Sequence, residues 1–217
     1  MEENNRPLPK SIFEKSVQRM RSKGHPLRLR ILEYLDVCGA TCVSDLAVIL
    51  EMDSLSVSQA LKYLRTQGIL KGIRCGRSVF YDYEDQTARG LFVCMRRQFG
   101  ILTGKKEFEN PEYKTLLPTD FVICVAERIK LLSHVDRMRI LEQLWLHNSL
   151  NVSQLSEVLG FSPLYVSQCL KKLREDCFVT CEKQGRFANY RICAELPKTL
   201  IRCMHNRYGS LKDKTLF

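Results

Sequence analysis

The sequence lacks any apolar run that approaches the ~20 residues of a membrane-spanning helix. Its first residues, 1–7, contain no apolar core of the kind found in secretory signal peptides. It also lacks a serine–histidine–aspartate order, a glycine-rich phosphate-binding loop and a paired-carboxylate motif. These absences argue against a membrane protein, a secreted protein and an enzyme, so we expect a soluble cytoplasmic protein without a cofactor.

Ten cysteines in 217 residues could suggest a disulfide framework. Such frameworks belong to short secreted chains, whereas this chain is longer and shows no signal peptide. We therefore expect free thiols in a reducing compartment.

The net charge is +10, and no single tail supplies it. Residues 1–108 carry 18 basic and 12 acidic side chains, and residues 109–217 carry 16 and 12. Both halves are therefore basic, by +6 and +4, which favours a polyanionic partner.

The chain matches itself at a spacing of 109 residues. Residues 25–83 align without a gap on residues 134–192, and 22 of the 59 aligned pairs are identical. Solenoid repeats have periods of about 20–50 residues, so this longer period indicates two copies of one small domain. We expect a disordered tail at 1–10, domains at 11–102 and 119–210, a linker at 103–118 and a second tail at 211–217.

Hydrophobic periodicity predicts the same order of elements in both copies. In the first, we expect helices over 11–21, 26–37, 43–50 and 54–67, strands over 69–74 and 78–83, and a closing helix over 87–99 that Gly100 ends. In the second, we expect helices over 119–132, 136–147, 152–159 and 162–176, strands over 178–182 and 187–192, and a helix over 197–208. The fold class is mainly α with small β-hairpin wings, that is, two tandem winged helix-turn-helix domains.

A winged helix-turn-helix places its last core helix in a major groove about 12 Å wide, so that helix must present small or polar side chains. In the helix over 54–67, Val57, Leu61 and Leu64 are spaced to face inward, and no acidic residue occurs between Ser54 and Tyr81. The predicted DNA-binding residues of this copy are Ser54, Ser56, Ser58, Gln59, Lys62, Tyr63, Arg65, Arg74 and Arg77. Of these, Ser54, Ser56, Gln59 and Tyr63 are expected to read bases and the four cations to hold phosphates.

The second copy offers corresponding residues, with Tyr165 and Gln168 as base readers. Its predicted DNA-binding residues are Ser162, Tyr165, Ser167, Gln168, Lys171, Lys172, Lys183 and Arg186. Glu175, Asp176 and Glu182 dilute its positive charge, so we expect the first copy to bind more strongly. The lysines and wing arginines of both copies also fit a merely solvated surface.

The order of these motifs resembles the ArsR/SmtB-type bacterial transcriptional repressors. The resemblance rests on residues 28–35, Val43-Ser44-Asp45-Leu46, the pattern Val57-Ser58-Gln59-x-Leu61-Lys62-x-Leu64, and Gly76-Arg77 followed by Tyr81, with matching residues in the second copy. It implies winged domains that dimerise through their first and last helices. It also implies sequence-specific binding to double-stranded DNA, often released by a metal or another inducer.

Members of that family usually have one domain and form dimers, whereas this chain has two copies. The leading and closing helices could therefore pack on one another within one molecule, as an intramolecular pseudo-dimer. Its unequal heads would read an imperfect palindrome with half-sites about 34 Å apart. Whether two chains associate further stays open, as does the identity of an inducer.

Two competing functions stay open: a metal- or thiol-responsive repressor, and a winged protein-interaction module that does not bind DNA. Cys42 lies where the family has Cys-Val-Cys, but Ser44 replaces the second thiol, and only Cys38 could assist. We therefore expect no metal site, and read Cys42 as a small buried side chain. His25 and His134 occupy the same repeat position and are expected to begin helices.

Overall fold

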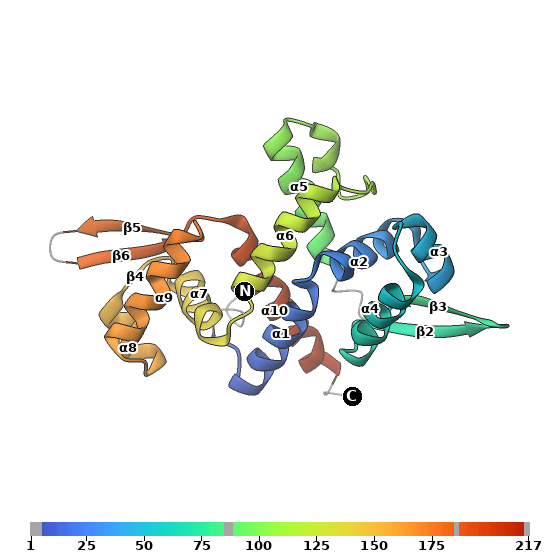
Figure 1. Ribbon diagram of the computed structural model, residues 1–217. Coiled ribbons are helices and arrows are strands. Elements are labelled where there is room, and N and C mark those ends of the chain that lie inside the picture. Colours follow the sequence, from blue (N-terminus) through green and yellow to red (C-terminus); the bar gives the residue numbers. More distant parts are fainter. Residues whose placement is uncertain (1–5, 85–88, 185–186, 215–217) are drawn as a thin grey trace. The chain divides into compact units, whose positions relative to one another are not determined.

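The computed structural model describes residues 6–84, 89–184 and 187–214 (Figure 1). The first repeat contains α1 (Lys10–Lys23), α2 (Pro26–Cys38), β1 (Thr41–Cys42), α3 (Val43–Ile49), α4 (Ser54–Thr66), β2 (Leu70–Cys75), β3 (Ser78–Tyr83) and α5 (Gly90–Thr103). A short 3₁₀ helix, η2 (Lys106–Glu109), follows. The second repeat contains α6 (Thr119–Leu132), α7 (Val135–His147), β4 (Leu150–Asn151), α8 (Val152–Leu159), α9 (Pro163–Glu175), β5 (Val179–Gln184), β6 (Phe187–Ile192) and α10 (Glu195–Lys214).

The predicted fold class, mainly helical with two β-hairpin wings, is confirmed. Each wing is larger than expected, because a two-residue strand before the third helix of each repeat joins it. The sheets are antiparallel, with strand orders β1-β3-β2 and β4-β6-β5. In the first, Thr41 pairs with Tyr81 and Leu70 with Tyr83. The extra strand fastens the wing to the start of the third helix, so that wing and helical core form one body.

The prediction that Gly100 ends the closing helix was wrong. Helix α5 continues to Thr103 and ends at Gly104, whose φ of 69° is left-handed. A side chain at position 100 would lie 2.7 Å from the Cβ of Phe108 and 2.8 Å from the carbonyl oxygen of Lys105. Gly100 is therefore required inside the helix because η2 packs closely against it.

The chain forms two compact units that do not follow its linear order. One unit contains residues 18–131 and hence the first winged body together with α6 up to Leu131. The other contains the second winged body, from Leu132 onward, together with residues up to Val17. Each winged body thus includes the leading segment of the other repeat. The domain boundaries predicted from the sequence, 11–102 and 119–210, describe segments that fold by themselves. They stay a prediction.

One buried carboxylate in each repeat holds the exchanged segment. The backbone N–H of Leu117 donates to Oε1 of Glu33 over 2.7 Å, and the backbone N–H of Leu8 donates to Oε1 of Glu142 over 2.9 Å. Both glutamates are 1% exposed or less. Leu8 and Leu117, like Glu33 and Glu142, are 109 residues apart. The repeat therefore extends back to the Leu-Pro pair before each leading helix, beyond the gap-free match that begins at His25.

We predict that Glu33→Ala destabilises the unit of residues 18–131 by about 3 kcal/mol, because Arg30 loses its buried partner and the N–H of Leu117 loses its acceptor. Urea unfolding followed by circular dichroism measures the loss. The matched control is Glu14→Ala, an exposed glutamate of α1, which should shift stability by less than about 0.5 kcal/mol. Equal shifts for the two variants would contradict a holding role for Glu33.

Candidate nucleic-acid interface

Helix α4 is built to present a polar face while anchored by an apolar one. Its N-cap is Asp53, whose Oδ1 accepts the backbone N–H of Ser56 over 2.7 Å, and hydrogen bonds to Ser56 lower the pKa of this aspartate. Val57, Leu61 and Leu64 have no exposed surface, which confirms their predicted inward orientation. The cap and the buried stripe together fix which side chains of α4 remain available to a partner.

The predicted contact residues of the first repeat fall into two groups by exposure. Ser56 and Tyr63 are half-buried, and the guanidinium of Arg28 lies 4.5 Å from the centre of the Tyr63 ring. The other predicted residues are exposed, namely Ser54, Ser58, Gln59, Lys62, Arg65, Arg74 and Arg77. Arg74 and Arg77 lie on the wing, whose turn uses a left-handed Gly76 with φ 61°. The first head thus joins an exposed polar helix to an exposed basic hairpin.

The leading helix holds the far end of α4. Nε of Arg19 donates to the carbonyl oxygen of Gln67 over 3.1 Å, and its Nη2 donates to that of Gly68 over 2.5 Å. These carbonyls belong to the C-terminal end of α4, where a cation is favoured by the helix dipole. The orientation of α4 therefore depends on α1 as well as on α2 and α3.

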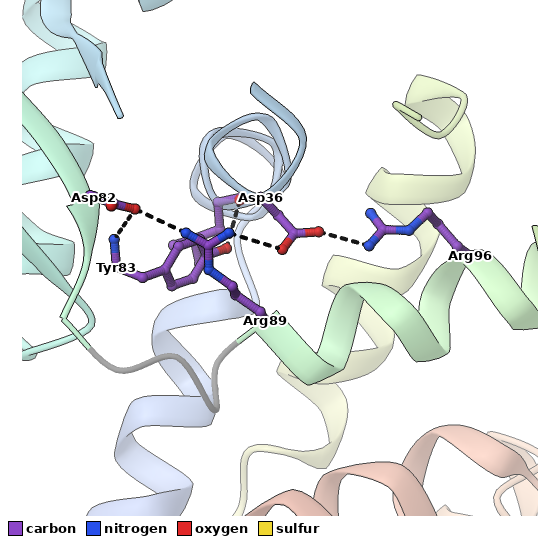
Figure 2. Close-up of polar contacts among 6 residues, drawn as sticks. Asp36, Asp82, Tyr83, Arg89 and Arg96 are labelled. Carbon is purple, nitrogen blue, oxygen red and sulfur yellow. Dashed lines mark hydrogen bonds and ion pairs between the residues drawn. The ribbon is translucent and has the colours of Figure 1, made fainter. Parts of the chain in front are cut away.

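A buried ion network connects the first wing to α2 and α5 (Figure 2). Asp36 of α2 accepts from Nη2 of Arg96 over 2.7 Å and lies 3.7 Å from Nη1 of Arg89. Arg89 also donates to Asp82 at the end of β3 over 3.1 Å. The Tyr83 hydroxyl donates to the carbonyl oxygen of Leu32 over 2.6 Å. Burial, with Asp36 nearby, raises the pKa of Tyr83 well above its ordinary value.

The second repeat replaces this network with other chemistry. Trp145, Ile192 and His205 stand where the first repeat has Asp36, Tyr83 and Arg96. Nε2 of His205 lies 2.9 Å from Oε1 of Glu142, and its ring centre is 4.9 Å from that of Trp145. His205 is 5% exposed and therefore packs in the interior of its unit. The second repeat therefore joins α7 to α10 by contacts that differ from the ion network of the first repeat.

The second head has its own cap and a less basic surface. Ser162 is the N-cap of α9: its Oγ accepts the backbone N–H of Tyr165 over 3.3 Å, and Pro163 follows it as the first residue of the helix. The Tyr165 hydroxyl donates to Oδ2 of Asp136 over 2.7 Å, and this hydrogen bond raises the pKa of the tyrosine. The hydroxyl of Tyr165 thus already has a partner, and its role as a base reader stays a prediction.

The remaining predicted residues of this head are exposed, namely Ser162, Ser167, Gln168, Lys171, Lys172 and Lys183. Nζ of Lys172 lies 3.4 Å from Asp176 and 3.8 Å from Glu175, so this cation is partly neutralised. Arg186 lies outside the described residues. From Ser54 to Tyr81 the first head carries five cations and no acid, whereas from Ser162 to Tyr190 the second carries five cations and three acids.

The cysteines provide no evident metal centre in the described part of the chain. No group of three or more histidine, cysteine, aspartate or glutamate side chains there could hold an ion. Cys42 is 7% exposed, and its Sγ lies 3.0 Å from Oγ of Ser44, the residue that replaces the family's second thiol. Cys38 is exposed at the end of α2, and all ten cysteines are free thiols.

His25 and His134 are the N-cap residues of α2 and α7, which confirms their predicted place at helix starts. Neither side chain makes a capping hydrogen bond. Burial, followed by the charges of Arg28 and Lys130, lowers the pKa of His25. No helix among the described residues is both long and apolar enough to cross a bilayer.

Comparison with known proteins places the likeness in the first head. Residues 25–71 match the family model described as "Bacterial regulatory protein, arsR family". The chain is 36% identical over 67 residues to the "Transcriptional repressor SmtB homolog" of Synechocystis sp., covering 31% of this chain and 50% of that protein. It is 33% identical over 79 residues to the "HTH-type transcriptional repressor SmtB" of Mycobacterium tuberculosis, covering 36% of this chain and 58% of that protein.

The chain thus spans little more than half the length of the curated relatives it matches. The matched segment runs from the start of α2 to the beginning of β2, so it contains the whole helix-turn-helix of the first repeat. The second helix-turn-helix is supported by the internal repeat and by its own structure.

We predict that Asp36→Asn destabilises the unit of residues 18–131 by about 3–5 kcal/mol. The buried guanidinium of Arg96, 2% exposed, keeps its charge in this variant but loses its anionic partner. Thermal or urea unfolding checks this value. Glu182→Gln removes the carboxylate of an exposed pair with Arg191, and should cost less than about 1 kcal/mol. A loss at position 36 no larger than that of the control would show that the network does not stabilise the fold.

Proposed function

We propose that the chain is a sequence-specific, double-stranded DNA-binding transcriptional regulator, and that it acts as a repressor. The observation that carries the proposal is the first head, where a capped helix with an exposed polar face adjoins an exposed hairpin, and residues 54–81 carry five cations and no acid. Such a surface matches the phosphate backbone of a duplex in sign, and α4 offers side chains that hydrogen-bond to base edges. The curated relatives are named as transcriptional repressors, which supports the same class.

We propose further that the two repeats act as an intramolecular pseudo-dimer, each head reading one half of an imperfect palindrome. The reciprocal exchange of leading segments supports this pairing, since each winged body is completed by the other repeat. The heads are unequal in charge, with five cations against no acid in one and five against three in the other. One half-site should therefore bind more tightly than the other.

Selection of bound duplexes from a random pool, using the full-length chain at physiological salt, tests the proposal. We expect an enriched site of two related but unequal halves, about 34 Å or one helical turn apart. An enriched site with a single half would contradict the pseudo-dimer alone. No enrichment, together with duplex binding that does not weaken as salt rises, would contradict DNA binding and favour the protein-interaction module.

A metal-responsive form of the same repressor is tested separately by titrating zinc into the protein–DNA complex. The structure favours no metal ligand set among the described residues, so we expect the affinity for DNA to stay unchanged. A large loss of affinity that Cys42→Ser abolishes would instead establish a thiol metal site.

Gln59 and Gln168 occupy the same repeat position, and both are exposed. Because each is expected to hydrogen-bond a base edge, we predict that either alanine variant costs about 1–3 kcal/mol and relaxes specificity in its own half-site only. Binding of both variants to a panel of single-base substitutions measures this effect. Relaxation of the same half-site by both variants would contradict two separate reading heads.

Lys62 carries no nearby acid on its head, whereas Lys172 is paired with Glu175 and Asp176. We predict that Lys62→Ala weakens binding to all sequences alike and flattens the slope of log affinity against log salt by about one. Lys172→Ala, which removes a cation of α9 that already has acidic partners, should flatten it clearly less. Salt titrations of both variants on the selected site decide the point, and identical slopes would contradict the predicted inequality of the heads.

A further inference from the structure

One leucine is exposed at the beginning of the last core helix of each head. Leu55 is the second residue of α4, after the N-cap Asp53, and Leu164 is the second residue of α9, after the N-cap Ser162. Their exposed fractions are 68% and 71%, the largest of any leucine whose side chain the structure describes. A single exposed leucine is ordinary on a protein surface, whereas a pair at one repeat position is a feature to be explained.

The internal repeat distinguishes this leucine from the other exposed apolar side chains of the first head. Five large apolar side chains are exposed between residues 26 and 83, and only Leu55 recurs as the same residue in the second repeat. Val48 and Ile73 are 78% and 48% exposed, and their counterparts 109 residues later are both glutamates. Those two positions therefore accept a charged side chain, as ordinary solvated surface does. The leucine at the start of the helix is kept in both heads.

The outer face of α4 contains Leu55, whereas other residues cap and anchor the helix. The cap is Asp53, and the anchor is the buried stripe that begins at Val57. Residues that are three, four or seven positions apart lie on one face of an α-helix. Leu55 therefore shares its face with Gln59 and Lys62, which are also exposed. A partner that contacts these two polar side chains meets the leucine as well.

The second head repeats this arrangement. On α9 the same spacing places Leu164 on one face with Gln168 and Lys171, and all three are exposed. Each head thus offers one outer face on which an apolar side chain comes first, an amide follows one turn later and a cation follows after a further turn.

The chemistry of the major groove determines what a leucine can recognise there. When a helix-turn-helix binds DNA, the residues at the N-terminal end of its recognition helix contact the base edges. A leucine side chain neither donates nor accepts a hydrogen bond, so it can recognise only an apolar group. The base edges of the major groove present one such group, the C5-methyl of thymine.

We propose that Leu55 and Leu164 each contact the C5-methyl group of a thymine in the half-site of their own head. The contact removes both apolar groups from water, and it favours thymine over cytosine, which carries no methyl group at that carbon. It adds to the hydrogen bonds expected of Gln59 and Gln168, because each leucine lies one turn before the glutamine on the same face. The proposal rests on the proposed function, since it names a base that each head selects.

The contact is tested with the full-length chain and the duplex enriched by selection, in which each thymine is replaced in turn by uracil. Uracil still pairs with adenine and lacks only the methyl group. We expect one replacement in each half-site to weaken binding by about fourfold, equivalent to ~0.8 kcal/mol, as for the burial of one methyl-sized group. Competition binding at fixed salt measures this change.

Two alanine variants assign each methyl group to its leucine. Leu55→Ala should abolish the effect of uracil in one half-site only, and Leu164→Ala should abolish it in the other only, as in a double-mutant cycle. Both side chains are exposed, so the variants should keep the fold, which circular dichroism checks. The matched control is Leu102→Ala, which shortens a leucine of nearly equal exposure, 67%, on α5. It should keep the full effect in both half-sites.

The possible failures are distinguishable. A selected duplex that binds equally well with thymine or uracil at every position would overturn the thymine contact and leave the proposed function standing. An effect of uracil that persists in both half-sites of an alanine variant would overturn the assignment to that leucine. Loss of the effect in the Leu102→Ala control would also overturn it. Absence of binding to any duplex would overturn the proposed function, and this contact with it.

Discussion

The architecture depends on two buried carboxylates, each of which accepts a backbone N–H in addition to contacting a basic side chain. Glu33 and Glu142 each accept the N–H of a leucine that begins the other repeat. A carboxylate buried to this extent is costly unless its oxygens are satisfied, and burial raises the pKa of Glu33. The leading segment and the glutamate are thus mutually required, since the segment supplies a donor and the carboxylate supplies an acceptor. This mutual requirement makes the leading segment of each repeat part of the winged body of the other repeat.

Much of the fold follows from the sequence, because it is encoded locally. The periodicity that buries Val57, Leu61 and Leu64, the serine–proline start of α9 and the glycine–arginine turn of the first wing all act within a few residues. The predicted helix and wing residues are mostly exposed, as a binding surface requires. Local signals therefore located both heads, although nothing in them shows which of these side chains contacts a base.

The features that sequence reasoning missed depend on contacts between distant segments. Gly100 is a helix-stop signal by itself, yet here η2 approaches it too closely for any side chain. In the leading segments, few identical pairs mark the longer repeat, among them the Leu-Pro pair at residues 8–9 and 117–118. The pairing of Tyr165 with Asp136 joins residues 29 positions apart, and no periodicity predicts it.

The differences between the repeats are concentrated where each winged body meets its neighbouring elements. On the wing side, the Asp36–Arg96 pair of one repeat is replaced by Trp145 and His205 in the other. On the side of the exchanged segment, Phe13 of one repeat is replaced by Val122 in the other, and both side chains are buried. In a homodimer one sequence must serve both sites, so neither change could occur alone. Duplication within one chain removes that constraint, and allows one head to become more basic than the other.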